Sequence, residues 1–176
     1  MTTGFSNSVI LPDNLPAIEP EDFTPVDPRY LKLIYINHLI SGVIIGLILL
    51  FLFILLQNEV PGWVGWTSGG VFIGIIIYSL IISRLSFFKR GYLIRERDIA
   101  YQRGLIRYRL TSIPFNRIQH VELIQSLIAK RMGLARIKVY TAGSAADDLE
   151  IPGLPLEVAS RIREFLTGKI SPDEQD

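Results

Sequence analysis

The sequence predicts a membrane helical hairpin followed by a small β-rich domain, and three observations lead to this fold class. Residues 33–83 carry a single formal charge, Glu59, in a chain of 176 residues. The stretch that follows, residues 84–138, carries thirteen basic and three acidic side chains. After residue 84, short apolar runs alternate with glycine and proline turn signals, which is typical of β-strands. The uncharged block excludes a simple soluble globule, and the lack of cysteine excludes a disulfide scaffold or a cysteine-ligated metal site.

The chain-wide totals conceal this division. With 49% hydrophobic residues and a net charge of +1, the composition resembles that of an average soluble protein. Residues 1–32 carry two basic and five acidic side chains, and residues 139–176 carry three basic and eight acidic ones. The acidic ends therefore mask a strongly basic block that directly follows an apolar one.

Two stretches are long and apolar enough to cross a bilayer, which takes about 20 residues as a helix. They are residues 33–56 and residues 63–83, which together form a predicted transmembrane hairpin over residues 33–83. Pro61-Gly62 lies in the short link between them and is a turn signal, so the two helices should be antiparallel. The alternative is a pair of buried helices in a soluble protein, but the 93 residues that follow are too few to enclose both.

The lysine and arginine residues that flank the two spans predict the orientation of the hairpin. The link at residues 57–62 has none, whereas Arg29 and Lys32 precede the first span and Arg84 and Lys89 follow the second. Because basic residues in short flanks stay on the cytoplasmic side, we expect a multi-pass protein of the inner (plasma) membrane with both termini in the cytoplasm.

Four glycines are candidates for helix packing. Gly42 and Gly46 are one turn apart in the first span, and Gly70 and Gly74 are one turn apart in the second. Small residues at this spacing let helix backbones approach closely, and in an antiparallel hairpin the two pairs fall at similar depth. The same spacing could instead form a face for dimerisation.

Residues 84–170 are predicted to form a cytoplasmic domain of short antiparallel strands. The clearest signal is the run from Ile106 to Thr111, where apolar residues alternate with basic or polar ones, so that one face is apolar and the other basic. The expected strands, in chain order, are residues 92–95, 99–103, 106–111, 117–123, 136–141 and 149–151.

Two helices should complete this domain. Ser126 can cap a short helix that Gly133 terminates, and Pro155 can occupy the first position of a longer C-terminal helix. An apolar stripe at spacings of three and four predicts that the second helix covers one opening of a curled sheet, ending at Gly168. We expect the N-terminal segment, residues 1–32, to be cytoplasmic and mostly irregular, and the tail, residues 171–176, to be disordered.

This order of elements is that of a pleckstrin-homology (PH) barrel, a curled antiparallel β-barrel capped by a C-terminal helix. Residues 28–168 resemble the bacterial pleckstrin-homology-like, membrane-flanked family, in its single-domain branch with two N-terminal membrane helices. The motifs that carry the resemblance are mostly turns and core positions, namely Gly91-Tyr92-Leu93-Ile94, Arg103-Gly104-Leu105, Thr111-Ser112-Ile113-Pro114, Arg117-Ile118-Gln119, Gly133-Leu134-Ala135, Thr141-Ala142-Gly143-Ser144 and Ile151-Pro152-Gly153-Leu154.

The resemblance implies a binding or scaffolding protein and no enzymatic activity or cofactor. Its implied partner is another membrane-flanked PH-like protein, with self-association as the alternative. It also implies a setting in envelope stress or in the export of toxic peptides.

The basic residues of this domain supply the candidate binding site for membrane lipids or for a partner. Side-chain parity on neighbouring strands places four arginines on one predicted face, and two further basic residues join them at the membrane junction. The alternative is a solvated strand face whose charges only set the topology. The candidate residues are Lys89, Arg90, Arg95, Arg97, Arg107 and Arg109.

Other chemistry is not expected from this sequence. The membrane anchor already accounts for the basic charge, so nucleic acid is not an expected partner. His120 is the sole histidine after the spans and fits a strand position better than a catalytic base; an enzyme active only in a complex is the remaining alternative. Asp147, Asp148 and Glu150 form an acidic loop cluster without a histidine, so no metal site is predicted.

Overall fold

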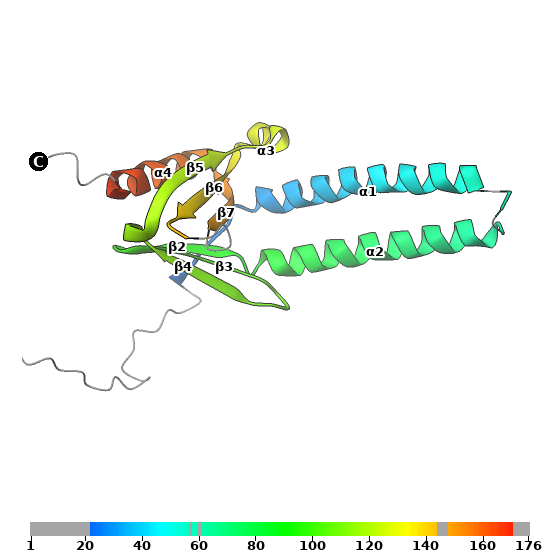
Figure 1. The fold of residues 1–176 in the computed structure, drawn as a ribbon. Helices are drawn as coiled ribbons and strands as arrows, with labels where there is room; N and C mark the ends of the chain where they lie inside the picture. Colours follow the sequence, from blue (N-terminus) through cyan, green and yellow to red (C-terminus); the bar gives the residue numbers. More distant parts are fainter. Residues whose placement is uncertain (1–21, 57, 60, 144–147, 171–176) are drawn as a thin grey trace, which may run out of the picture.

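The computed structural model describes residues 22–56, 58–59, 61–143 and 148–170. Figure 1 shows two long antiparallel helices that extend from one end of a small β domain. The predicted disordered tail and residues 1–21 lie outside the described residues. The predicted fold class is confirmed, with two differences in the β domain and several in the boundaries.

The helical pair consists of α1 (Arg29–Leu56) and α2 (Trp63–Phe87). Each helix extends four residues beyond the predicted span at the end that meets the β domain. The reason is that these turns pack on protein: Tyr30 and Leu31 contact the main core, and Phe87 is a buried member of it. An apolar stretch in the sequence marks the exposed apolar part of each helix. It does not reveal the additional helical turns that pack on the β domain.

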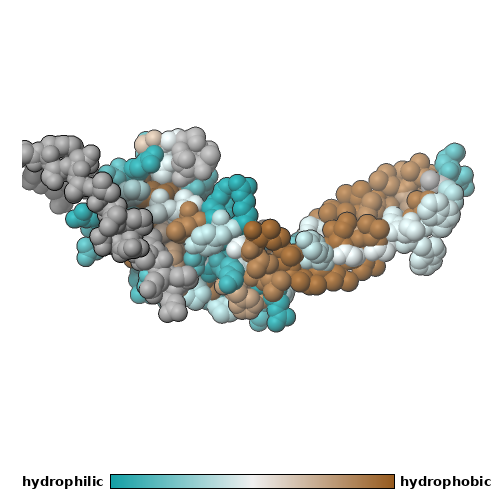
Figure 2. Space-filling model, turned by 90° about the horizontal axis from the view of Figure 1, so that it is seen from below, coloured by the Kyte–Doolittle hydropathy of each residue, from teal (hydrophilic) through white to brown (hydrophobic). Residues whose placement is uncertain are grey.

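The apolar surface of both helices is uncovered. Only 6% of the most apolar 18-residue window of each helix is buried, which is far less than in the core helix of a soluble protein. Figure 2 shows this surface as a continuous hydrophobic band beyond the hydrophilic domain. Both helices are therefore long and apolar enough to cross a bilayer.

The predicted glycine packing is only partly seen in the structure. A Cβ added at Gly42 would lie 3.3 Å from Ile76 Cδ1, and one at Gly46 would lie 3.4 Å from the Phe72 ring, so both glycines face α2. A Cβ at Gly70 or Gly74 would meet open space, so these two do not face α1. The reason is steric: Gly42 and Gly46 pack against the large side chains Ile76 and Phe72 of α2, and not against the glycines of α2.

The first sheet has four strands in the order β1-β2-β3-β4, all antiparallel. The strands after the helices are β2 (Gly91–Ile94), β3 (Asp98–Arg103) and β4 (Arg109–Pro114). The edge strand β1 (Thr24–Pro25) lies before α1, in the segment predicted to be mostly irregular. This segment joins the domain because Phe23 and Val26, on either side of β1, are buried.

The second sheet has the order β5-β6-β7 and is also antiparallel. Its strands are β5 (Ile118–Ile124), β6 (Leu134–Thr141) and β7 (Leu149–Pro155), and the short 3-10 helix Phe115–Arg117 precedes β5. The described residues thus form two separate sheets rather than one curled barrel as predicted. Strand β7 continues past Pro152 through an irregularity, where its register with β6 shifts and Gly153 adopts φ +73°, a conformation that glycine tolerates.

The predicted strand at residues 106–111 begins later than expected. Gly104, at φ +109°, opens a five-residue connection, and β4 starts only at Arg109. A Cβ at Gly104 would lie 2.0 Å from the Arg107 carbonyl oxygen, so this tight turn requires glycine. The alternating apolar residues Ile106 and Tyr108 are therefore exposed in a turn instead of facing the core.

Two helices complete the domain. The short α3 (Leu127–Arg131) is capped by Ser126 as predicted, whose hydroxyl accepts a hydrogen bond from the Ala129 amide at 3.3 Å. The C-terminal α4 (Leu156–Ile170) packs on β5 and β6 and does not end at Gly168. Its buried side chains complete a core whose largest fully buried members are Ile99, Ile137, Val139, Ile151, Leu154 and Leu166.

Candidate functional site

The junction between the helices and the β domain is built from side chains of both parts. Tyr30, in the first turn of α1, packs on the domain core, and a Cβ at Gly153 would lie 2.4 Å from its ring. Arg90, just before β2, donates a hydrogen bond of 3.2 Å to the Tyr30 hydroxyl and lies 5.6 Å from the ring centroid. A backbone hydrogen bond also crosses the junction, from the Asp27 amide to the Gly153 carbonyl at 2.9 Å.

A second set of contacts fixes the other side of the junction. Leu33 of α1 is buried with Ala129 of α3 and Leu134 of β6 in a small core of its own. Arg29 binds the Asp27 carboxylate at 2.9 Å and also donates to the Met132 carbonyl at 3.1 Å. Because α1 is held to α3, β6 and β7 at once, the domain has a fixed orientation relative to the helical pair.

The structure separates the four arginines that were predicted to share a face. Arg95 and Arg97 lie in the turn between β2 and β3, which we call the far turn (residues 95–97). Arg107 lies in the connection between β3 and β4, which we call the near tip (residues 104–108), and Arg109 directly follows it. The length of β3, six residues or about 20 Å, separates the two groups, so the predicted single basic face does not exist.

At the far turn, the charge of Arg95 is neutralised within the domain. Arg95 forms a close bidentate ion pair with Asp98, and Ser112 of β4 donates a further hydrogen bond to the same carboxylate. The Arg95 guanidinium lowers the pKa of Asp98 below its usual value, although burial of the carboxyl acts in the opposite direction. Arg97 at this turn is exposed.

The remaining predicted residues lie near the junction. Lys89 is exposed between α2 and β2, whereas Arg90 is half-buried on Tyr30 and has a structural role there. Arg107 and Arg109 are exposed. Among the described residues, neither of these two arginines forms an ion pair, so both remain available to an external anion.

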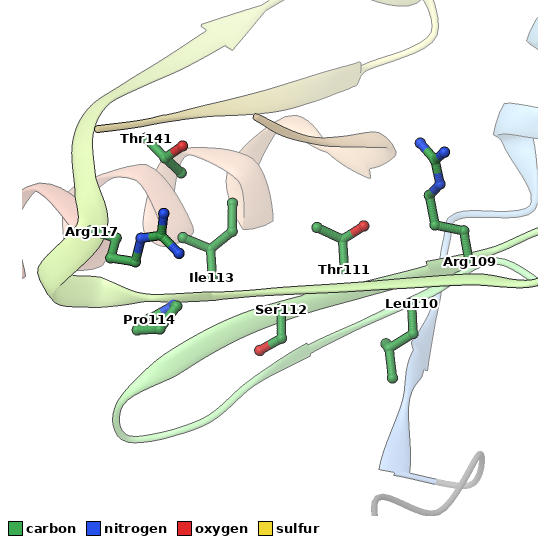
Figure 3. A pocket seen from close by; sticks show the side chains of 8 residues that line it. All are labelled: Arg109, Leu110, Thr111, Ser112, Ile113, Pro114, Arg117 and Thr141. Atoms are coloured by element: carbon green, nitrogen blue, oxygen red, sulfur yellow. The ribbon is translucent and has the colours of Figure 1, made fainter. Parts of the chain in front are cut away.

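A cavity of about 490 Å³ opens between the two sheets, and we call it the inter-sheet cleft. Figure 3 shows Arg109, Thr111 and Ile113 pointing from β4 into this space. Arg117, which precedes β5, and Thr141, at the end of β6, face the same space from the other sheet. The cleft exists because the sheets are not joined along β4, and it combines two guanidinium groups with two hydroxyl groups.

The chemistry of the inter-sheet cleft suits an acidic ligand group. In the described part of the chain, Arg117, like Arg109, has no ion-pair partner, and the buried Thr141 hydroxyl has no hydrogen-bond partner. Guanidinium groups match the geometry of carboxylates and phosphates, to which they can donate two parallel hydrogen bonds. The cleft could therefore accept a carboxylate or phosphate from a ligand.

A smaller cavity of about 350 Å³ adjoins this cleft and shares Arg109 and Thr111 with it. Its wall includes Tyr101, whose buried hydroxyl has no partner among the described residues; burial raises the pKa of Tyr101 to about 12. Asp148 lines the same cavity, accepts a hydrogen bond from the Thr141 amide and lies 3.7 Å from the Lys138 ammonium group. This region therefore already balances acidic and basic groups.

The residues considered for catalysis or metal binding lie elsewhere. The side chain of His120 is 64% exposed on the outer face of β5, with its Nε2 atom 3.6 Å from Glu122. Glu150 pairs with Arg136 at 2.9 Å, and Asp147 lies outside the described residues. In the described ranges, no three His, Asp or Glu side chains gather to hold a metal ion.

Sequence reasoning missed Arg117, Thr141 and the apolar residues of the near tip. Arg117 ends the 3-10 helix before β5 and Thr141 ends β6, and no local motif reports that the pairing of β5 with β6 brings them together. The inward position of Thr141 was available from the alternation with Ile137 and Val139, both of which are buried. For Ile106, the signal was a large apolar residue in a turn, where polar residues are usual.

Comparisons with known proteins agree with this architecture. A family model described as "Bacterial PH domain" matches residues 29–170, which includes both long helices and the β domain. UPF0699 transmembrane protein YdbS of Bacillus subtilis (strain 168) is 30% identical over 108 residues, which is 61% of this chain and 66% of the relative. The chain thus covers just under two thirds of that relative's length. No solved structure gives a significant match.

Proposed function

This chain is a transmembrane member of the bacterial PH domain family, and we propose that it acts as a membrane-anchored binding scaffold rather than as an enzyme. The proposed ligand of its PH-like domain is an acidic segment of a second membrane protein, which places a carboxylate or phosphate in the inter-sheet cleft. The observation that carries this proposal is the pair Arg109 and Arg117, which face one cavity without an ion-pair partner in the described chain.

The fixed junction supports a scaffolding role. A domain tethered by a flexible linker would sample many orientations, whereas this domain is held by Tyr30, Leu33 and Arg90. A cleft with a constant orientation to the membrane meets other membrane proteins at a raised effective concentration and in a defined geometry. This favours assembly with a membrane partner over capture of a soluble one.

The proposal includes the topology and the partner. The link between the helices lies outside, both termini lie in the cytoplasm, and the membrane is the inner (plasma) membrane. The partner is another membrane-flanked PH-like protein, with a second copy of this chain as the alternative. We keep envelope stress or the export of toxic peptides as the proposed physiological setting, which rests on the family resemblance alone.

Photocrosslinking in intact membranes tests the proposed partner site. A photoreactive residue at Thr111, which faces the inter-sheet cleft, should form a crosslink to one membrane protein. The substitution Arg117→Glu should remove that crosslink, whereas Arg163→Glu, an exposed arginine of α4, should leave it intact. A Thr111 probe that captures no protein, or a crosslink that survives Arg117→Glu, would contradict the proposal.

Cysteine labelling tests the proposed topology independently. The chain has no native cysteine, so one introduced at Asn58 should react with an impermeant reagent added to intact cells. One introduced at the exposed Asn116, in the β domain, should react only after the membrane is opened. The reverse pattern would overturn the orientation.

A further inference from the structure

The near tip and α3 both lie at the end of the β domain from which the two long helices leave. The β2–β3 register pairs Gln102, next to this tip, with Gly91, which follows α2 by only three residues. Helix α3 lies beside α1, because Ala129 packs on Leu33. Figure 1 shows the near tip and α3 on either side of the helical pair, reaching alongside its first turns.

The near tip exposes large apolar side chains. Ile106 is 81% exposed and Tyr108 is 63% exposed, although turns that face water are usually built from small polar residues. Gly104 fixes the backbone of this turn and so keeps these side chains pointed away from the core. An apolar tip of this kind exposes surface to water unless something covers it.

Helix α3 repeats this arrangement on the other side of the helical pair. Leu127 is 87% exposed, although Ser126 holds its backbone in a regular helical turn. Its neighbours in the last turn, Lys130 and Arg131, are exposed and form no ion pair in the described part of the chain. The near tip has the same combination, since the exposed Arg103 precedes its apolar residues and the exposed Arg107 lies between Ile106 and Tyr108.

We propose that the near tip and α3 form a two-part rim that inserts into the headgroup layer of the bilayer crossed by α1 and α2, with a preference for anionic lipids. Exposed apolar side chains bordered by arginine and lysine are typical of surfaces that lie at a membrane interface. The apolar groups enter the boundary between headgroups and acyl chains, and the basic groups contact lipid phosphates.

The position of the rim favours lipid over a protein partner. The rim lies beside the helical turns that leave the domain, where the bilayer surface begins if the helices cross it. A protein could cover one of the two elements, but the bilayer reaches both sides of the helical pair at once. The rim shares only Arg107 with the basic face predicted from the sequence, and it does not depend on the inter-sheet cleft.

The test uses the full chain in nanodiscs of phosphatidylcholine, with and without phosphatidylglycerol. A single cysteine at Tyr108 carries the fluorophore NBD, and the lipids include a chain-labelled doxyl quencher. We expect severalfold stronger quenching at this site than at a matched label on Arg97, at the far turn. A second label on Leu127 should be quenched like the one on Tyr108.

Substitutions in the Tyr108-labelled chain separate the apolar and the electrostatic contributions. Ile106→Asp should lower the quenching in both lipid mixtures. Arg107→Glu should lower it chiefly in the anionic mixture and less at high salt, where charges are screened. The matched control Arg97→Glu should leave it unchanged.

Several outcomes would overturn the proposal. Equal quenching at the near tip and the far turn would show that the tip does not reach the lipid. Quenching that neither Ile106→Asp nor Arg107→Glu changes would show that these side chains do not mediate the contact. An NBD blue shift without lipid quenching would show that protein, such as a second copy of the chain, covers the tip.

Discussion

The two ends of the β2-β3-β4 sheet carry similar basic residues and use them differently. At the far turn, Arg95 is paired with Asp98, and Ser112 donates to the same carboxylate, so the charge of this arginine is satisfied within the domain, and no large apolar side chain of this described turn stands exposed beside Arg97. At the near tip, Arg107 has no such partner among the described residues and stands beside exposed apolar side chains. An arginine count therefore does not locate a binding surface. Satisfied arginines stabilise a turn, whereas unsatisfied ones beside apolar surface mark a place for a ligand.

The junction creates this difference between the two ends, because it determines which end lies beside the two apolar helices. Tyr30, Arg90 and Gly153 connect the first turn of α1 to β7 and to the start of β2. An isolated β domain beginning after α2 would lose β1 and Tyr30 from its core. The full chain is therefore the form in which the stability of this domain has to be measured.

The largest expected effect comes from breaking the junction. Gly153→Ala adds a Cβ at φ +73° and 2.4 Å from the Tyr30 ring. We expect the unfolding free energy of the domain to fall by about 2–4 kcal/mol, from the left-handed backbone and from overpacking. Thermal unfolding in detergent measures the change. Gly168→Ala, in α4 with open space around it, is the control and should not destabilise; equal midpoints for the two variants would contradict the account.

The second prediction concerns the ring that the junction surrounds. Tyr30→Ala removes a half-buried aromatic side chain and should destabilise the domain by about 2 kcal/mol. Tyr30→Phe keeps the ring and loses only the hydrogen bond from Arg90, so its cost should be about 1 kcal/mol. Tyr78→Ala, on a lipid-facing position of α2, is the matched control for thermal unfolding. If it costs as much as Tyr30→Ala, the junction has no special role.

The third prediction tests the far turn. Since Arg95 lowers the pKa of Asp98 in the folded state, the pair contributes stability above the ordinary carboxyl pKa of about 4, and this contribution is lost as the pH falls through the lowered value. Asp98→Asn should cost about 0.2–1 kcal/mol at neutral pH, because Arg95 is partly exposed.

The same variant should reduce the dependence of stability on pH below about 4. Asp27 retains a similar dependence in both proteins, since Arg29 lowers its pKa as well. Chemical unfolding across this pH range measures the difference. Arg97→Gln, at the same turn without an ion pair in the described chain, should behave like the parent protein; an Asp98→Asn profile as steep as the parent's would contradict the assignment.

The smallest expected effect on folding lies at the near tip. Ile106→Asp changes a side chain that is 81% exposed, so the unfolding free energy in detergent should change by no more than about 0.5 kcal/mol. A much larger loss would show that Ile106 is part of the folded core. A small change would sharpen the comparison, because the tip would then matter for contact with lipid and not for folding.

The sequence predicted the fold class because its strongest signals are local. Charge-free apolar runs, the Ser126 cap and the turn at Gly104 each depend on a few neighbouring residues, and the structure contains all three. Period-two alternation was less reliable: it predicted a strand from residue 106, where the chain forms a turn. Alternation reports side-chain chemistry and cannot show whether a sheet continues.

The candidate sites depended on long-range geometry and were therefore harder to predict. The parity of Arg95, Arg97 and Arg107 gave no information on which end of β3 each residue occupies. The strand β1 was missed because two residues carry no strand signal of their own, and only their pairing with β2, between the buried Phe23 and Val26, reveals it. The inter-sheet cleft depends on where two sheets separate, which no local pattern encodes.

The contacts at the junction hold the β domain in one orientation relative to the two long helices. The most direct test is a distance measurement by pulsed electron resonance between spin labels on Leu39, an exposed position of α1, and Gln119, an exposed position of β5, in nanodiscs. We expect one narrow distance distribution, unchanged by lipid composition and broadened by Gly153→Ala. A broad or multiple distribution in the parent protein would contradict this expectation.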